Sequence, residues 1–379
     1  MTGATPTVET GLISGDDHMD MCYVPKDLWQ SRVPKKWRSE APEVVTLENG
    51  LPMWVKEGRA WGSWGSKKAD GRKVPFDAAG LEEEPEPGVF RPSSAKYRLA
   101  DMDMDNLYAQ VMYNFVDWRF EDQELKSECL TAFNSWMAEF CSADPERLIG
   151  LAVLPSHDSV RAVAELHRTI ELGLRGAQFD VFGATVPIYD ASWDPLWSAA
   201  EESGTVISVH IGFGGALPPR GPLAPPQTHR GWHLPAAAAV MCMQLATVLS
   251  DVTMSGMLER HPNLKFVLGE SSIGWIPFVL ERLDFECDNY REHTDELPSM
   301  KPSEQFRRNI YCTFQDEEVG VSLIPYIGED NVMWAADYAH ADGTFPHSVE
   351  SVDRIFANYP EALKVKATHD TASRLYGII

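Results

Sequence analysis

Eight short runs rich in apolar and β-branched residues recur along the chain, and several are separated by stretches with helical periodicity. The runs are Leu12–Asp17, Leu107–Tyr113, Leu148–Leu154, Gly176–Val181, Val206–His210, Lys265–Gly269, Ile310–Phe314 and Val332–Ala336. Strands that alternate with helices are typical of βαβ units, whose strands run parallel in one sheet. Eight such units predict a (β/α)8 barrel of the TIM type, and a doubly wound open sheet is the alternative. We expect a single domain over residues 1–379, since this length fits one barrel with insertions.

Two of the intervening segments carry clear helix signals. Residues 159–173 place Val160, Val163 and Leu166 roughly on one face and end at Gly173. Residues 194–204 have an expected N-cap at Asp194, a proline directly after it and a glycine at the end. Both segments predict amphipathic helices that cover the sheet.

Two segments interrupt the repeat. Residues 40–100, between the first two runs, and residues 212–235, after the fifth, are rich in glycine, proline and tryptophan. Long irregular loops in a compact domain serve as lids, binding loops or interface arms, and the tryptophans favour packing over disorder. We therefore expect the 40–100 insertion to act as a lid or an interface arm, and we expect a homodimer.

Charge and cysteine content exclude several classes of protein. The chain has 33 basic and 56 acidic residues, a formal charge of -23, which repels nucleic acid and anionic membranes. No basic, apolar signal is recognised at the start and no later run is expected to span a bilayer, so a cytoplasmic protein is predicted. The six cysteines lack CxxC spacing, which favours reduced thiols over disulfides or a thiolate metal site.

Polar side chains follow several of the predicted strands at the point where each strand ends. Asp16, Asp17 and His18 close the first, His210 the fifth, Glu270 the sixth and Asp337 the last. A barrel of this kind carries its active site at these carboxyl ends. Alternation along a strand would point Asp16 and His18 the same way and Asp17 the opposite way. A single such histidine is usually a hydrogen-bonded core residue, but the set favours a divalent cation with nitrogen and oxygen ligands.

Four stretches, taken in order, carry a resemblance to a known family. They are "ISGDDHMDMCYVPKDLW", "PIYDASWDPLWSAAEESGTVISVHIG", "ERHPNLKFVLGESSIGWIPFVLERLD" and "VMWAADYAHADGTFPHS". Together they resemble the amidohydrolase-related family that includes aminocarboxymuconate semialdehyde decarboxylase and resorcylate decarboxylases. The resemblance implies a metal-dependent barrel in which Asp16, His18, His210 and Asp337 bind the ion, with zinc expected first and manganese or iron as alternatives. The chain departs from the decarboxylase pattern at Asp16, where a histidine or glutamate is usual, and at Glu270, where a histidine is usual.

These residues lead to a primary hypothesis of metal-dependent hydrolysis of a small aromatic or cyclic substrate through activated water. Asp337 or Glu270 would move the proton, and His340 resembles a supporting position next to the metal carboxylate. An anionic Glu270 favours hydrolysis, since it would repel a substrate carboxylate. The alternatives are nonoxidative decarboxylation of an aromatic or muconate-like acid on the same scaffold, and a metal-free binding barrel.

Three further residues are candidates for substrate binding: His157, Arg119 and His233. His157 follows the third strand and would either face the pocket or cap its loop. Arg119 could clamp a carboxylate, although arginines in so acidic a chain more often pair with surface acids. His233 belongs to the long loop after the fifth strand, where a solvated position is the alternative.

Overall fold

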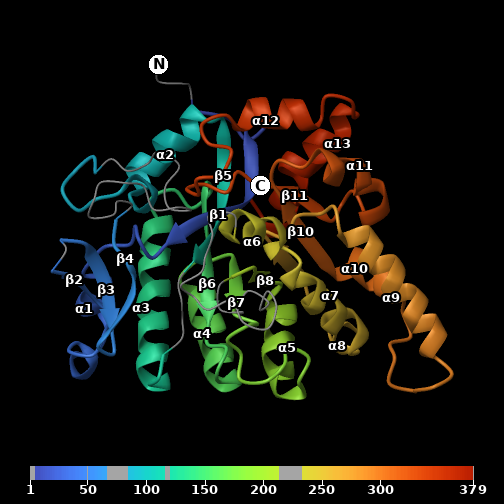
Figure 1. Ribbon diagram of the computed structural model, residues 1–379, viewed down its shortest axis with the longest axis horizontal. Helices are drawn as coiled ribbons and strands as arrows, with labels where there is room; N and C mark the ends of the chain where they lie inside the picture. Colours follow the sequence, from blue (N-terminus) through green and yellow to red (C-terminus); the bar gives the residue numbers. More distant parts are fainter. Residues whose placement is uncertain (1–4, 49, 66–83, 116–119, 213–232, 379) are drawn as a thin grey trace.

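The computed structural model describes residues 5–48, 50–65, 84–115, 120–212 and 233–378. Eight parallel strands pair in chain order into one sheet, and Figure 1 shows helices packed around it. The strands are β1 (Leu12–Asp20), β5 (Leu107–Phe115), β6 (Leu148–Leu154), β7 (Gly176–Phe179), β8 (Val206–His210), β9 (Phe266–Gly269), β10 (Ile310–Phe314) and β11 (Val332–Trp334). The predicted (β/α)8 barrel is therefore confirmed.

The first and last strands meet along the seam that closes the barrel. The backbone N–H of Asp337 donates to the carbonyl of Asp16 at 3.1 Å, and that of His18 donates to the carbonyl of Tyr338 at 2.5 Å. The Ser14 hydroxyl accepts a further hydrogen bond from the N–H of Ala336 at 2.8 Å. The residues that continue β11 are thus joined to the carboxyl half of β1.

Helices cover the outside of the barrel and fill the connections. They are α1 (Leu28–Arg32), η1 (Lys35–Trp37), η2 (Arg91–Ser93), α2 (Ala95–Met104), α3 (Gln123–Cys141), α4 (Ser159–Glu171), η3 (Ala191–Trp193), α5 (Asp194–Ser203), α6 (His233–Met241), α7 (Gln244–Met254), α8 (Met257–Arg260), α9 (Ile276–Tyr290), α10 (Pro302–Asn309), α11 (Glu318–Ile327), α12 (Ser348–Ile355), α13 (Glu361–Val365), the π-helical turn η5 (Lys366–Asp370) and α14 (Thr371–Tyr376).

Two predicted helices form with small corrections. The face predicted for α4 is wrong at Val160, which is 78% exposed, because the buried stripe runs through Ala162, Leu166 and Thr169. Asp194 is the first residue of α5 and not its cap, since the short helix η3 leads directly into it. The helix ends as predicted at Gly204, whose φ of 68° lies in the left-handed region that glycine tolerates.

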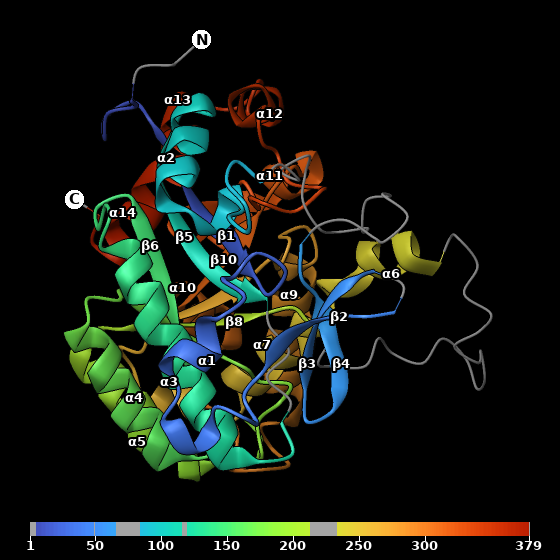
Figure 2. The ribbon, with the colours of Figure 1, turned by 90° about the vertical axis from the view of Figure 1, so that its left-hand side faces the viewer.

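The 40–100 insertion is more regular than expected. Residues 43–63 form an antiparallel sheet of β2 (Glu43–Thr46), β3 (Pro52–Lys56) and β4 (Arg59–Ser63), which lies beside the barrel in Figure 2. The buried Trp54 donates from its indole to the carbonyl of Met21 at 2.7 Å, and Trp64 donates to that of Val24 at 3.0 Å. The tryptophans therefore tie the small sheet to the segment that follows β1.

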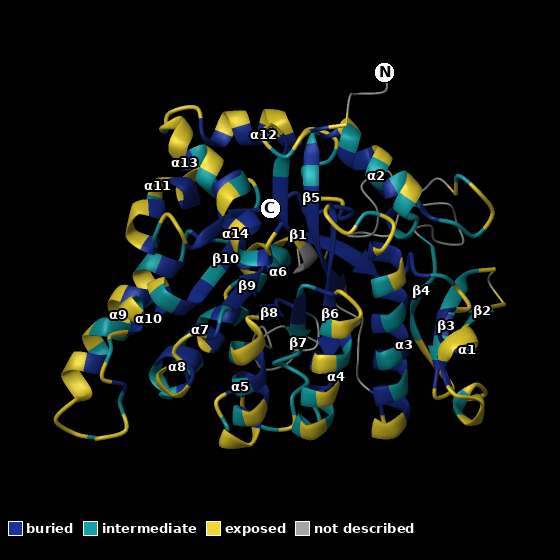
Figure 3. Ribbon diagram, turned by 180° about the vertical axis from the view of Figure 1, so that it is seen from behind, coloured by how far each residue is buried: buried dark blue, intermediate teal, exposed yellow. Residues whose placement is uncertain are grey.

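Burial follows the layers of the barrel, with buried strands inside and helices exposed on their outer faces (Figure 3). All six cysteines are free thiols, and Cys242 alone among them is half-buried. The expectation that no run could span a bilayer is wrong by length and composition, because Pro235–Met254 is long and apolar enough. Leu245, Leu249 and Val252 of this stretch pack in the hydrophobic core, so this part of the stretch is a core helix of the barrel.

Candidate functional site

The carboxyl ends of the strands bring most of the predicted site residues together. The imidazole Nε2 of His18 lies 2.9 Å from Oδ1 of Asp337 and 3.8 Å from Oδ1 of Asp16. Nε2 of His210 lies 3.2 Å from Oε2 of Glu270 and 3.7 Å from Oδ1 of Asp16. These five side chains come from β1, β8 and the residues after β9 and β11, as the sequence predicted.

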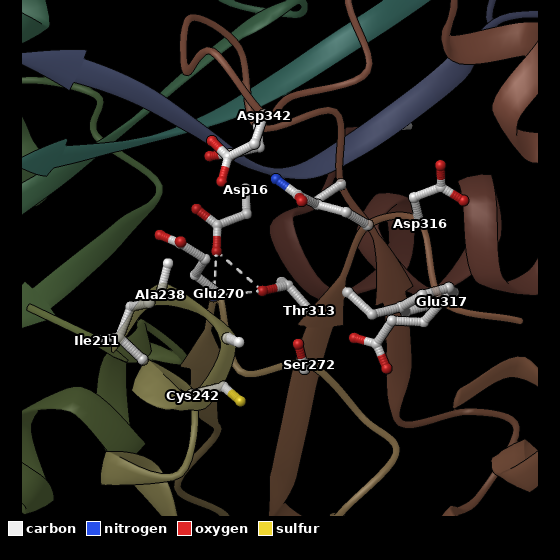
Figure 4. A pocket seen from close by; sticks show the side chains of 15 residues that line it. Asp16, Ile211, Ala238, Cys242, Glu270, Ser272, Thr313, Asp316, Glu317 and Asp342 are labelled. Atoms are coloured by element: carbon white, nitrogen blue, oxygen red, sulfur yellow. Dashed lines mark hydrogen bonds between the residues drawn. The ribbon is translucent and has the colours of Figure 1, made fainter. Parts of the chain in front are cut away.

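The Asp16 carboxylate is oriented by hydrogen bonds on one oxygen only. Oδ2 accepts from the backbone N–H of Glu270 at 2.6 Å and from the Thr313 hydroxyl at 2.8 Å, contacts that Figure 4 draws as dashed lines. Oδ1 is buried and has no hydrogen-bond partner among the described residues. One oxygen thus fixes the carboxylate, while the other is turned toward the two histidines.

The donor set fits a divalent cation. One ligand atom each from Asp16, His18 and His210 lies within 4.8 Å of the others, and the same holds for His18, Glu270, Asp337 and His340. Ligand atoms that surround one cation at bonds of about 2.1 Å are separated by about 3–3.5 Å. The contacts of 2.9 to 3.8 Å between these carboxylates and imidazoles bracket that separation. Imidazole nitrogens and carboxylate oxygens also suit zinc, manganese or iron.

Electrostatics in the buried cluster favour positive charge. Burial lowers the pKa of His18, but the carboxylates of Asp20 and Asp337 outweigh that effect and raise it to about 10. Burial raises the pKa of Asp16 to about 6, against the opposing pull of His210 and His18. Burial also tends to raise the pKa of Asp337, yet the charges of His340 and His18 hold it below its usual range. The buried carboxylates therefore stabilise positive charge on the neighbouring imidazole of His18.

His340 lies between two carboxylates next to the cluster, and the supporting role that the resemblance implied for it remains a prediction. Its Nδ1 is 2.9 Å from Oδ1 of Asp337, its Nε2 is 3.1 Å from Oδ2 of Asp20, and its ring stacks on His18 at 3.8 Å. Asp20 was not among the residues predicted from the sequence. The alternation that pairs Asp16 with His18 extends to residue 20 and could have indicated it.

The backbone around the site is strained. Asp337, Glu270 and Ser272 have φ values of 55°, 46° and 50°, which non-glycine residues rarely adopt. Each such residue costs of the order of 1–3 kcal/mol and persists where surrounding contacts hold it. At Gly269, a Cβ atom would lie 3.0 Å from the His210 ring and 3.1 Å from Oδ2 of Asp16, so only glycine fits without displacement.

A cavity of about 250 Å³ opens beside the cluster, with Asp16 and Glu270 in its wall (Figure 4). Its described lining also includes three acids that were not predicted from the sequence: Asp316, Glu317 and Asp342. Neither lysine nor arginine occurs among the described residues of this wall. Burial and the neighbouring Asp337 raise the pKa of Asp342. The cavity is therefore strongly acidic over the part that the structure describes.

The three substrate-binding candidates remain predictions. His157 Nε2 lies 3.0 Å from the hydroxyl of Ser127 on α3, and His157 is not among the described residues that line the cavity. Burial lowers the pKa of His157 to about 4. Arg119 lies outside the described residues, and His233 begins α6 with its side chain outside them.

Comparison with known proteins gives consistent relatives. The family model described as amidohydrolase matches residues 77–378. The γ-resorcylate decarboxylase of Rhodococcus jostii is 27% identical over 258 residues, which cover 62% of this chain and 73% of that protein. The crystal structure of 5-carboxyvanillate decarboxylase from Sphingomonas paucimobilis has a TM-score of 0.62 at 27% identity, over 74% of this chain and 82% of that one.

A third protein shares the fold and contains a metal. The dihydroxybenzoic acid decarboxylase of Polaromonas, solved with bound manganese and the inhibitor 2-nitroresorcinol, has a TM-score of 0.64 at 20% identity, over 97% of each chain. The first two relatives, each 27% identical to this chain, are decarboxylases, so the expected hydrolase is not confirmed and the alternative reaction is favoured. The donor set of this chain supports a divalent metal, but it does not single out zinc over manganese or iron.

Proposed function

This chain belongs to the amidohydrolase family, and from that premise we propose that it is a metal-dependent, nonoxidative decarboxylase of a small aromatic or muconate-like acid. The observation that carries the proposal is the buried cluster of acids and histidines at the carboxyl ends of the barrel strands, in a chain whose named relatives are decarboxylases. Two of those relatives match it over 73% and 82% of their own lengths.

Asp16, His18, His210 and Asp337 would hold the ion, and manganese is the ion to test first because a relative of this fold binds it. When bound, the ion would neutralise the substrate carboxylate and a neighbouring phenol or enol oxygen. The acidic cavity makes this neutralisation necessary, since the described wall contains neither lysine nor arginine. A carboxylate that entered the cavity of the metal-free protein would meet mainly negative charge.

Glu270 is our choice for the residue that supplies a proton to the ring carbon. Its side chain is 24% exposed and lies at the cavity, whereas those of Asp16 and Asp337 are almost fully buried. Cleavage of the carbon–carboxylate bond releases CO₂ and leaves the electron pair on the ring carbon, which then takes the proton from the glutamic acid. Solvent can return a proton to Glu270 through the open side of the cavity, so the residue can act in every turnover.

The direct test is a stoichiometric assay for CO₂. Protein loaded with Mn²⁺ would be given a panel of hydroxybenzoates, carboxylated methoxyphenols and muconate-like acids, with the products read by mass. We expect one substrate class to lose one CO₂ per product formed, and the activity to disappear when a chelator removes the metal. Turnover of esters, lactones or amides without CO₂ release would contradict the proposal.

Hydrolysis is the second candidate, and one observation favours it. The partly exposed carboxylate of Glu270 lies 3.2 Å from Nε2 of His210 and could accept a proton from water. A reaction run in water labelled with oxygen-18 separates the two reactions. Hydrolysis places the label in a product acid, whereas decarboxylation leaves the aromatic product unlabelled.

A further inference from the structure

We propose that Tyr338, together with Arg98 and Asp101 of helix α2, positions the residues that bind the metal. The inference rests on the metal site of the proposed function, but it concerns side chains outside the cavity. It gives Arg98, in the last part of the 40–100 insertion, a role in positioning the metal site from outside the cavity.

The turn after β11 is the element that needs support. Asp337 has a φ of 55°, and this strained residue is followed by Tyr338, whose N–H donates to Oδ1 of Asp17 at 2.9 Å. Asp17 faces away from the metal cluster, as the strand alternation predicted, and burial raises its pKa to about 8 while the charge of Arg98 opposes that rise. The backbone on both sides of Asp337 is thus held by β1.

Arg98 contacts both segments that carry proposed ligands. Its guanidinium is fully buried, donates from Nη1 to the carbonyl of His18 at 2.8 Å and lies over the Tyr338 ring at 4.8 Å. Its Nε donates to Oε1 of Gln110 on β5 at 2.7 Å, which fixes the side chain from the other side. One arginine thereby connects the strand of His18 with the turn of Asp337.

Asp101 completes the connection from the same helix. The Tyr338 hydroxyl donates to Oδ2 of Asp101 at 2.6 Å, and Arg91 pairs with the same carboxylate through its Nε at 3.0 Å. Asp101 stands three residues after Arg98, so both side chains project from one side of α2. The hydroxyl of Tyr338 therefore joins the strained turn to α2 by a hydrogen bond, in addition to the contact of its ring with Arg98.

A purely structural network would contribute to stability alone, so the test separates stability from metal binding. Tyr338→Phe removes one hydroxyl and keeps the ring under Arg98. The control is Tyr311→Phe, a partly buried tyrosine near the amino end of β10, whereas the turn of Asp337 follows the carboxyl end of β11. Manganese dissociation constants would be measured by competition with a chelator, the electron paramagnetic resonance spectrum of the bound ion recorded, and thermal unfolding followed without metal.

We expect Tyr338→Phe to weaken Mn²⁺ binding about tenfold and to alter the spectrum of the bound ion, as loss of an outer support typically does. The Tyr311→Phe control should keep the wild-type affinity and spectrum, whatever its unfolding temperature. Wild-type affinity and spectrum in Tyr338→Phe would overturn the inference. It would also be overturned if Tyr311→Phe lost as much stability as Tyr338→Phe and lost the same amount of Mn²⁺ affinity.

A second pair of variants covers the case in which Tyr338→Phe does not fold. Asp101→Asn keeps an oxygen that can accept from the tyrosine hydroxyl and should retain most of the affinity, whereas Asp101→Leu should lose it. Equal affinities in the two would refute the proposed role. Failure of the wild-type protein to bind Mn²⁺ would instead reject the metal centre itself, so the two failures are distinguishable.

Discussion

Glu270→Gln is the substitution that tests the reaction most sharply. Glutamine keeps the size of the side chain and the same strain at φ 46°, and it removes the charge and the transferable proton. The backbone at this position is held independently of the side chain, since its N–H donates to Oδ2 of Asp16 at 2.6 Å and to the Thr313 hydroxyl at 2.7 Å. The indole of Trp275 donates to the carbonyl of Ser271 and so does not depend on Glu270. We expect the free energy of unfolding to change by less than about 1 kcal/mol.

The expected loss of activity follows from the role in proton transfer. A positioned acid contributes about 10²–10⁴-fold, so kcat should fall by at least about 10²-fold, equivalent to about 2.7 kcal/mol. If Glu270 is not a metal ligand, Mn²⁺ affinity should fall by no more than about tenfold, in line with the loss of a neighbouring charge. A larger loss of affinity would show that Glu270 binds the ion.

The assay combines single-turnover CO₂ release, a metal titration and the KM for the true substrate. Asp342→Asn is the matched control, because it removes another carboxylate from the same cavity wall without touching an ion pair of Glu270. The control should lose less than about fivefold in kcat. Unchanged kcat in Glu270→Gln, with a lower KM, would refute the proton-transfer role and would mean that the glutamate merely repels the substrate.

Three further substitutions and one measurement of molecular mass test other parts of the structure. His210→Ala should remove bound metal and activity together, and full metal occupancy with normal turnover, measured by elemental analysis and CO₂ release, would contradict its role as a ligand. Gly269→Ala should lower the free energy of unfolding by about 1–3 kcal/mol and weaken Mn²⁺ binding, because the new Cβ would press on His210 and Asp16. A chemical denaturation curve and a metal titration that both equal those of the wild type would count against this prediction. Burial lowers the pKa of His157 from its ordinary value of 6.5 to about 4 in the folded state, so its contribution to stability is complete above pH 6.5 and is lost as the pH falls toward 4. Between pH 7 and pH 4.5, the free energy of unfolding of His157→Gln should therefore fall by about 1 kcal/mol less than that of the wild type, a difference reduced because His157 is only half-buried. Equal falls in the two proteins, measured by denaturation, would refute the prediction. Light scattering at micromolar concentration should give about twice the chain mass of 42.4 kDa, and a monomer would contradict the expected homodimer.

The barrel could be predicted because its signals are local. β6, β8 and β10 have the predicted bounds, since each is a short apolar run that ends at a polar or turn residue. The gathering of Asp16, His18, His210 and Asp337 followed from one geometric rule, that parallel strands present their carboxyl ends on one side. Their gathering could be predicted without knowledge of side-chain packing.

The small sheet could not be predicted in the same way. β3 and β4 are joined by Glu57 and Gly58, with φ values of 50° and 72°, which is the pattern of a type I′ hairpin. Glutamate is an uncommon first residue in such a turn, and the surrounding glycines and tryptophans obscure the strand alternation. The sequence signal was present but weak.

Arg98, Asp101 and Asp342 could not be placed by sequence because their partners are distant in the chain. The hydroxyl of Tyr338 reaches a residue 237 positions away, and no short motif records that contact. Asp20 is different, because its alternation with His18 along the first strand is visible in the sequence. Only its contact with His340 could not be predicted. Side chains that support a site from another element are fixed by packing, which local patterns do not encode.

The seam between β1 and the end of β11 has a consequence for how the protein is made. Asp337 leaves the ribosome more than 300 residues after Asp16 and His18, so the seam pairs segments that are synthesised far apart in time. Contacts of such high sequence separation form late, after most of the chain has collapsed. A nascent chain would therefore carry two histidines and several acids but no assembled site, and it would take up metal tightly only when the last strand docks. Metal uptake would then report completion of the barrel, and a ribosome-stalled chain that ends before β11 should fail to retain the ion.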